Sequence, residues 1–273
     1  MVLERLIRIF LWASALFTIF ILIAILGHII GKGLHAVNLE FLLEYPRSMG
    51  REGGISPAIV GTVYLTAISI LIASPIGIGA AVYLTEYARK GRILNFIRFS
   101  TETLAGIPSI IFGLFGYVFF VIYMGFSWSL LSGGLTLAFM ILPTIVRTSE
   151  EAIRAVPDSY REGSLSLGAT RWQTTVRVVL PSAISGIVTG IILSIGRAVG
   201  ETAAVFLTAG SSLRMPTSIM DPARTMSVHL YVLAAEGISL EKAYATATVL
   251  VVLVLMINLF STFVIKKVFS RGI

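Results

Sequence analysis

The sequence has 273 residues, of which 56% are hydrophobic and only 13% are charged. Soluble domains are typically about 25% charged, so an ordinary soluble globular protein is excluded. The chain contains no cysteine, which excludes disulfides, thiolate catalysis and cysteine metal sites. A net charge of +7 on so apolar a chain indicates a membrane protein whose charges gather on one side.

Long intervals without charge locate the membrane spans. A charge at the bilayer centre costs about 2.5–3.5 kcal/mol, and about 20 apolar residues cross the hydrocarbon. The predicted fold class is therefore all-α, a polytopic membrane protein with six transmembrane helices. The first helix and an outer loop occupy 1–52, and the remainder of the chain, 53–273, holds five helices and a long cytoplasmic loop over 148–183. The helices are expected at about 9–31, 57–85, 103–124, 130–147, 184–208 and 243–265.

The distribution of charge predicts the orientation of these helices. Six spans put both termini on the same side of the membrane, together with the loops over 86–102 and 147–182. That side carries 14 Lys and Arg, and the opposite side carries six. Because Lys and Arg concentrate in cytoplasmic loops, the 14-charge side is expected to be cytoplasmic. Nucleic-acid binding is excluded, since these charges flank helices and form no single patch.

The longest cytoplasmic loop is predicted to fold into two short helices, which we call the elbow (residues 158–181). Ser159 followed by Glu162 has the spacing of a capping box, and Gly168 is placed to end that helix in a left-handed conformation. Thr170 opens a second helix with the same capping-box spacing.

The elbow is either a solvated connector or a docking element. Its apolar side chains are too numerous for a free loop, so we expect burial against the chain's own helix ends or against a partner protein. These side chains are Leu165, Leu167, Trp172, Val176, Val178 and Val179.

Arg197 and Glu201 are the charged residues that lie well inside a predicted span. Because they are four residues apart, they are expected to share a helix face that points to a cavity or a partner helix rather than to lipid. One interpretation is a neutralising pair that fixes helix packing. The other is an anion site, in which the guanidinium binds a tetrahedral oxyanion while Glu201 positions it and competes with the substrate. Glycines that would allow close helix approach recur at Gly186, Gly190, Gly196 and Gly200.

The elbow resembles the signature of ABC-importer permeases: Glu-Ala-Ala, three residues, Gly, nine residues, Ile, one residue and Leu-Pro. In this chain Gly163 and Ser164 stand in place of the two alanines, and Val178 stands in place of isoleucine. In that family the signature docks into a groove on a separate ATPase subunit, which implies the same role here. The matching positions are Glu162, Gly163, Ser164, Gly168, Val178, Leu180 and Pro181.

Further motifs resemble the permeases of Pst-type phosphate importers, and the PstA type more than the PstC type. Arg197-Ala-Val-Gly-Glu201-Thr202 is similar to their RA-x-GET element, and 53–66, 75–88 and 102–116 are similar to other segments of them. The resemblance implies a type I ABC importer (MetI-like) permease fold in a prokaryotic inner membrane. It also implies that Arg197, Glu201 and Thr202 lie on the substrate path.

The same resemblance implies partners for the chain. They are a homologous PstC-like permease subunit, cytoplasmic PstB-like ATPase subunits and an extracytoplasmic PstS-like phosphate-binding protein. The sequence has no G-x-x-x-x-G-K-[ST] motif, so ATP would be used by a partner subunit, and no cofactor of its own is expected. We expect a transport subunit and not an enzyme.

Several alternatives stay open. Arginine chemistry does not separate phosphate from molybdate, tungstate or sulfate, and the chain could be the PstC-like half of a heterodimer or one half of a homodimer. An intramembrane enzyme is disfavoured because the spans hold no catalytic cluster. A standalone channel is disfavoured because a channel needs no ATPase-docking elbow. No catalytic residue is predicted, and no metal ligands either, because His28, His35 and His229 have no second ligand at metal spacing.

Overall fold

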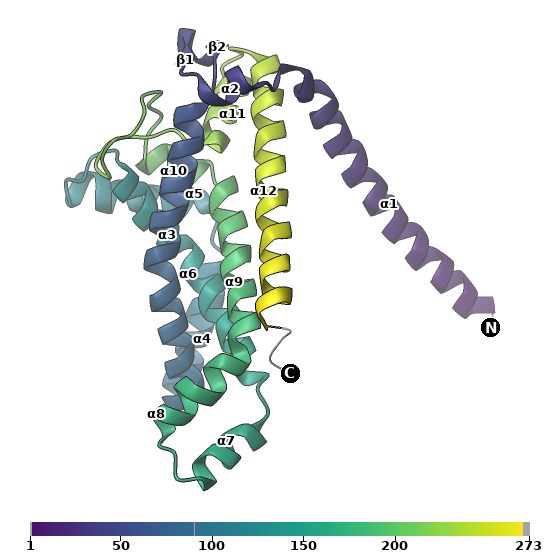
Figure 1. The fold of residues 1–273 in the computed structure, drawn as a ribbon, viewed down its shortest axis with the longest axis vertical. Helices are drawn as coiled ribbons and strands as arrows, with labels where there is room; N and C mark the ends of the chain where they lie inside the picture. The colour runs from purple at the N-terminus through teal and green to yellow at the C-terminus, as the bar shows by residue number, and fades with distance from the viewer. Residues whose placement is uncertain (1, 90, 270–273) are drawn as a thin grey trace.

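The computed structural model describes residues 2–89 and 91–269, so the last four residues of the predicted cytoplasmic tail lie outside the described part. Most of the described residues are helical. One small antiparallel sheet joins β1 (Pro46–Arg47) and β2 (Glu52–Gly53). The predicted all-α class is confirmed. Figure 1 shows all the long helices except the N-terminal one running along one axis, with the sheet at one end and the elbow at the other.

Five helices of the described residues are long and apolar enough to cross a membrane. A sixth span is possible if a helix pair bent by 98° counts as one span. The five long helices are α1 (Val2–Gly33), α3 (Ser56–Val82), α6 (Leu130–Arg154), α9 (Leu180–Gly200) and α12 (Leu240–Phe269). The bent pair is α4 (Arg92–Ala105) and α5 (Ser109–Gly116), and a π-helix over Tyr117–Tyr123 extends α5.

The remaining elements are short. The short α-helices are α2 (Leu39–Leu43), α7 (Asp158–Ser166), α8 (Arg171–Thr174), α10 (Ala203–Thr208) and α11 (Met226–Ala235). Two 3-10 turns cover Leu34–Ala36 and Ser48–Gly50, and two further π-helical segments cover Tyr83–Tyr87 and Thr175–Val179.

The third predicted helix, 103–124, is wrong as a continuous element. The helix that precedes it ends at Ala105, and a new one begins at Ser109. Pro108 between them has ψ of 139°, outside the helical region. Proline lacks a backbone N–H and disfavours helical geometry in the residue before it, so the hydrogen-bond ladder stops there. The fourth helix differs too, because α6 continues to Arg154 instead of ending at 147.

The core is built around α6, which packs against α3 on one side and α9 on another. Leu137, Ile141 and Ile145 of α6 are fully buried. Glycines allow the neighbouring helices to come close: a Cβ on Gly77 of α3 would lie 2.7 Å from Ile145 Cγ2, and one on Gly190 of α9 would overlap the Thr148 hydroxyl. Small residues at such contacts favour helix packing in membranes, where dispersion contacts replace the hydrophobic effect.

Helix α1 leaves the bundle instead of packing along it (Figure 1). It is held at its C-terminal end, where Thr248 Oγ1 of α12 donates to the Ile29 carbonyl at 3.3 Å and His28 meets the Tyr244 ring edge-on. The most apolar stretch of α1 has none of its residues buried within the chain. Lipid or another subunit must therefore cover this helix in the membrane.

Candidate functional site

The elbow consists of α7 and α8 joined by a tight turn. Gly168 in that turn has φ of +85°, the left-handed conformation predicted for it. The second capping box is confirmed: Gln173 N donates to Thr170 Oγ1 at 3.2 Å, and Thr170 N donates to Gln173 Oε1 at 2.9 Å. Across the turn, the Ser164 and Thr174 hydroxyls lie 3.0 Å apart and link the two helices.

The first capping box, from Ser159 to Glu162, is wrong. Helix α7 begins one residue earlier, at Asp158, and Pro157 before it supplies no side-chain cap. Asp158 Oδ1 instead accepts a hydrogen bond from Arg161 Nη1 at 3.1 Å. Pro157 is extended, with ψ of 140°, and the helix begins at the next residue. The helix therefore starts without a serine cap.

Arg161 anchors the elbow to the bundle, a role that the sequence did not reveal. Its Nη2 lies 2.9 Å from Glu86 Oε1, beyond the end of α3, and also donates to the Ile153 carbonyl of α6 at 2.9 Å. Its Nη1 donates to the Val156 carbonyl at 2.7 Å. One guanidinium therefore joins the elbow to two membrane helices.

The apolar side chains of the elbow divide into two groups. Val179 is fully buried within the chain and Val178 is half-buried, so these two pack against the chain's own helices. Leu167 is 91% exposed and Trp172 is 64% exposed. Leu165 and Val176 are exposed as well. The exposed group forms an apolar surface on the elbow that this chain does not cover.

The other signature positions lie around that surface. Ser164, Val178 and Leu180 are half-buried at the base of the elbow. The remaining positions are exposed, and they are Glu162, Gly163, Gly168 and Pro181. No described atom lies within 4 Å of a Cβ built on Gly163 or Gly168, so the backbone there is open to a partner.

The fifth predicted helix, 184–208, is also broken, and the break falls on its charged residues. Helix α9 ends at Gly200, Glu201 is extended with ψ of 130°, and α10 begins at Ala203. Arg197 and Glu201 therefore share no continuous helix face. Among the described residues, no carboxylate forms an ion pair with Arg197, so the interpretation of Arg197 and Glu201 as a neutralising pair is wrong.

Glu201 instead satisfies backbone groups that the break leaves without partners. Its Oε1 accepts from the Ala204 N–H at 3.2 Å, in the first turn of α10. Its carbonyl accepts from the Ser227 hydroxyl of α11 at 2.6 Å. Helix ends expose N–H and C=O groups that need such partners when they are removed from water. The sequence contains no local signal for Ser227, which lies 26 residues further along the chain.

Arg197 lies on an open face of the subunit. Leu193, Gly196, Arg197 and Gly200 follow one helical stripe of α9. Leu193 is 57% exposed, and nothing lies within 4 Å of a Cβ on Gly196 or Gly200. The expected close approach of helices is found at Gly186 and Gly190, which contact α6. It is not found within the described chain at Gly196 and Gly200.

The two helix breaks belong to packed neighbours. Helix α5, which follows the Pro108 break, contacts α10, which follows the Glu201 break. A Cβ on Gly113 of α5 would lie 2.8 Å from Ala204 Cα. Interrupted backbone at membrane depth is tolerated only where protein covers it or where it lines an aqueous cavity. The two broken segments therefore cover part of each other's backbone.

At the sheet end of the molecule, Arg224 and His229 form a buried polar pair. Arg224 donates through Nε and Nη2 to the Ser211 carbonyl, at 3.2 and 3.0 Å, and its Nη1 lies 3.3 Å from His229 Nδ1. His229 is 1% exposed. Burial, together with the charge of Arg224, lowers the pKa of His229 to about 4. The imidazole is therefore neutral near pH 7.

A bundle of apolar helices, two of them broken beside each other, with an exposed elbow at one end, defines a membrane permease of the ABC importer class. Comparison with known families agrees: the model described as "Binding-protein-dependent transport system inner membrane component" matches residues 73–272. The chain belongs to this family, and it is a multi-pass membrane protein.

Individual relatives extend the match over most of the chain. It is 36% identical to the probable ABC transporter permease protein YqgI of Bacillus subtilis, over 88% of this chain and 87% of that protein. It is also 36% identical to the phosphate transport system permease protein PstA of Pasteurella multocida, over 91% of this chain and 89% of that protein. The predicted resemblance to PstA permeases is confirmed.

Solved structures confirm the expected MetI-like fold. A chain of a bacterial alginate ABC transporter, in complex with an alginate-bound periplasmic protein, matches with a TM-score of 0.69 at 17% identity, over 99% of both chains. A chain of the inward-facing MetNI methionine ABC transporter matches with a TM-score of 0.63 at 22% identity, over 76% of this chain and 93% of that chain.

Proposed function

We propose that this chain is a permease subunit of an ATP-driven importer of inorganic phosphate and forms half of its translocation path. The observation that carries the proposal is Arg197 on the open face of α9. The name of the PstA relative, 36% identical over 91% of the chain, supports phosphate as the substrate. A guanidinium presents five N–H donors in a planar fork, which matches a tetrahedral oxyanion.

The substrate path is proposed to run past Arg197, Glu201 and Thr202. Because no described atom lies within 4 Å of a Cβ on Gly196 or Gly200 beside the half-buried Arg197, we place the second, PstC-like permease subunit across from this stripe. Phosphate would then pass between the two subunits. Since no carboxylate of the described residues forms an ion pair with Arg197, its positive charge would be available to the anion. Glu201 and the half-buried Thr202 would hold the break in shape beside it.

The elbow is proposed to dock onto a PstB-like ATPase in the cytoplasm. The apolar surface of Leu165, Leu167, Trp172 and Val176 supports this role, because nothing in the described chain covers it. In this orientation both termini are cytoplasmic. The sheet end would face a PstS-like binding protein outside. Closure of the ATPases would move the elbow, and Arg161 would transmit that movement to α3 and α6.

Uptake of radiolabelled phosphate tests the proposal most simply. Cells that lack their own high-affinity phosphate uptake would express this chain with its neighbouring permease, ATPase and binding-protein genes. We expect ATP-dependent uptake that excess molybdate, tungstate or sulfate does not compete away. Competition by one of these oxyanions at phosphate-like concentrations would reassign the substrate. Failure of an ATPase subunit to co-purify with the chain would contradict the docking role, and the co-purified permease would distinguish a heterodimer from a homodimer.

A further inference from the structure

A second group of arginines lies away from the elbow turn and from Arg197. A cavity of about 330 Å³ opens between the π-helix that follows α3, the first two turns of α4 and the last turn of α6. Arg98 of α4 and Arg154 of α6 line it. The rest of its wall is formed by Leu84, Thr85, Ala88, Gly91, Leu94 and Asn95.

Both arginines share a single carboxylate. Arg98 Nε lies 2.7 Å from Glu150 Oε1, and Arg154 Nη2 lies 2.6 Å from the same oxygen. Glu150 is only 8% exposed. One carboxylate balances one guanidinium, so the cluster keeps one positive charge. The Arg154 side chain is 50% exposed, so its remaining N–H groups stay accessible from the cavity side.

The neighbouring cluster on the same end of the bundle has the opposite balance. There the single guanidinium of Arg161 contacts two carboxylates, Glu86 and Asp158, and its other N–H groups donate to backbone carbonyls. Arg161 is therefore saturated. The cluster beside Glu150 thus differs from the Arg161 cluster in keeping a positive charge at its cavity, which suits the cavity to an anion.

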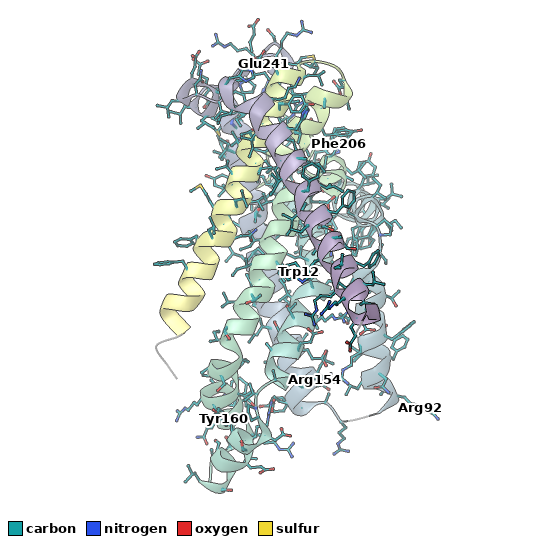
Figure 2. The ribbon with its side chains drawn as sticks, turned by 90° about the vertical axis from the view of Figure 1, so that its right-hand side faces the viewer. Trp12, Arg92, Arg154, Tyr160, Phe206 and Glu241 are labelled. Atoms are coloured by element: carbon teal, nitrogen blue, oxygen red, sulfur yellow. The ribbon has the colours of Figure 1, made fainter. Side chains whose placement is uncertain are left out.

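The surroundings of the cavity have the character of a membrane surface. Helix α4 exposes Ile93, Phe96 and Phe99, which are 79%, 69% and 66% exposed. Tyr83 and Tyr87 of the adjoining π-helix are exposed as well. Aromatic and apolar residues beside basic ones are typical of the level of lipid headgroups. Figure 2 shows Arg92 and Arg154 at the same end of the molecule as Tyr160 of the elbow.

We propose that this cavity binds an oxyanion of the phosphate class through Arg98 and Arg154. The headgroup of an anionic phospholipid is the favoured source, because the apolar face of α4 beside the cavity would contact the acyl chains. Free inorganic phosphate offers the same chemistry. The site is separate from Arg197, so it stands or falls independently of the proposed translocation path.

Ligand-dependent stability of the purified permease complex in detergent tests the proposal. The probes are dioctanoyl phosphatidylglycerol, dioctanoyl phosphatidylcholine and inorganic phosphate, each titrated while the thermal unfolding midpoint is followed. We expect phosphatidylglycerol to raise the midpoint while phosphatidylcholine does not, which identifies a lipid headgroup. A rise with inorganic phosphate alone identifies free phosphate. No rise with either anion would overturn the proposal.

Arg154→Gln should raise the concentration of anion needed for half of the effect about tenfold, as expected for loss of a charge-assisted contact. The matched control is Arg147→Gln, which makes the same change on α6 at a surface pair with Glu151. Asn95→Leu, which narrows the cavity without a change of charge, should weaken binding as well and serves if Arg154→Gln does not fold. The proposal would be overturned if a folded Arg154→Gln or Asn95→Leu variant bound the anion as tightly as the unmodified protein. It would also be overturned if Arg147→Gln lost as much affinity as Arg154→Gln.

Discussion

Arg161 Nη2 lies 2.9 Å from Glu86 Oε1, so the elbow is tied to the end of α3 by residues 75 positions apart in sequence. Both side chains are mostly buried, with 19% and 13% of their surfaces exposed. Removing the carboxylate from such a pair leaves a mostly buried guanidinium without its main counter-charge. The pair is therefore a mechanical link between the proposed ATPase-docking elbow and the membrane helices.

Glu86→Ala should destabilise the attachment of the elbow by about 1–3 kcal/mol, because Arg161 keeps only Asp158 and backbone carbonyls as partners. We expect substrate-stimulated ATP hydrolysis by the purified complex to fall, with the ATPase still bound. The control is Glu151→Ala, which breaks the exposed Arg147–Glu151 pair and should cost less than about 1 kcal/mol. Equal effects of the two variants would show that the Glu86 pair is no special link.

Gly168→Val should uncouple ATP hydrolysis from transport. A β-branched residue at φ of +85° strains the backbone by about 1–2 kcal/mol, which would distort the turn between α7 and α8. ATPase rate and phosphate uptake measured in the same proteoliposomes check this. The matched variant is Gly163→Ala, at an open helical position, where Ala gains about 1 kcal/mol of helix propensity and coupling should persist. Normal coupling in Gly168→Val would count against the docking role of the turn.

Glu201→Gln should retain most phosphate uptake, whereas Glu201→Ala should reduce it severalfold. Gln keeps the side-chain oxygen that accepts from the Ala204 N–H, while Ala loses this cap, at a cost of about 0.5–2 kcal/mol. Initial uptake rates, normalised to the amount of assembled complex in the membrane, distinguish the two variants. If Glu201→Gln is as defective as Glu201→Ala, the negative charge itself is required and capping is not the main role of the residue.

Stability should depend on pH through His229. Its pKa is about 4 in the folded chain and close to 6.5 when unfolded, so between these values the unfolded state binds more protons. The stability that His229 contributes is therefore complete above pH 6.5 and is lost as pH falls towards 4. His229→Gln should make the drop in thermal midpoint between pH 7 and pH 5 smaller. The exposed His35→Gln serves as a control and should leave that drop unchanged.

Features encoded by neighbouring residues could be predicted from the sequence. The long apolar helices follow from intervals without charge, because insertion into lipid depends on local hydropathy. The capping box of Thr170 and Gln173 and the left-handed Gly168 also follow from residues within a few positions of each other. The Ser159 capping box failed because Pro157 had already set the start of the helix.

Features that depend on contacts distant in sequence could not be predicted. The sequence predicts a continuous helix over 184–208, yet the helix breaks at Glu201. There the Glu201 carbonyl accepts from the Ser227 hydroxyl, and its carboxylate accepts from the Ala204 N–H. Tertiary contacts of this kind override local helix propensity. For the same reason the pairing of Arg161 with Glu86, 75 residues away, left no signal in the sequence.

The most direct test of the central claim is phosphate uptake by Arg197→Ala. We expect uptake to be abolished while the complex assembles and binds its ATPase normally, because the variant removes the proposed anion-binding guanidinium of the half-buried Arg197, which has no ion pair among the described residues. The matched control is Arg214→Ala, an exposed arginine of the loop before α11, which should transport phosphate like the unmodified protein. Normal phosphate uptake by Arg197→Ala would contradict the account.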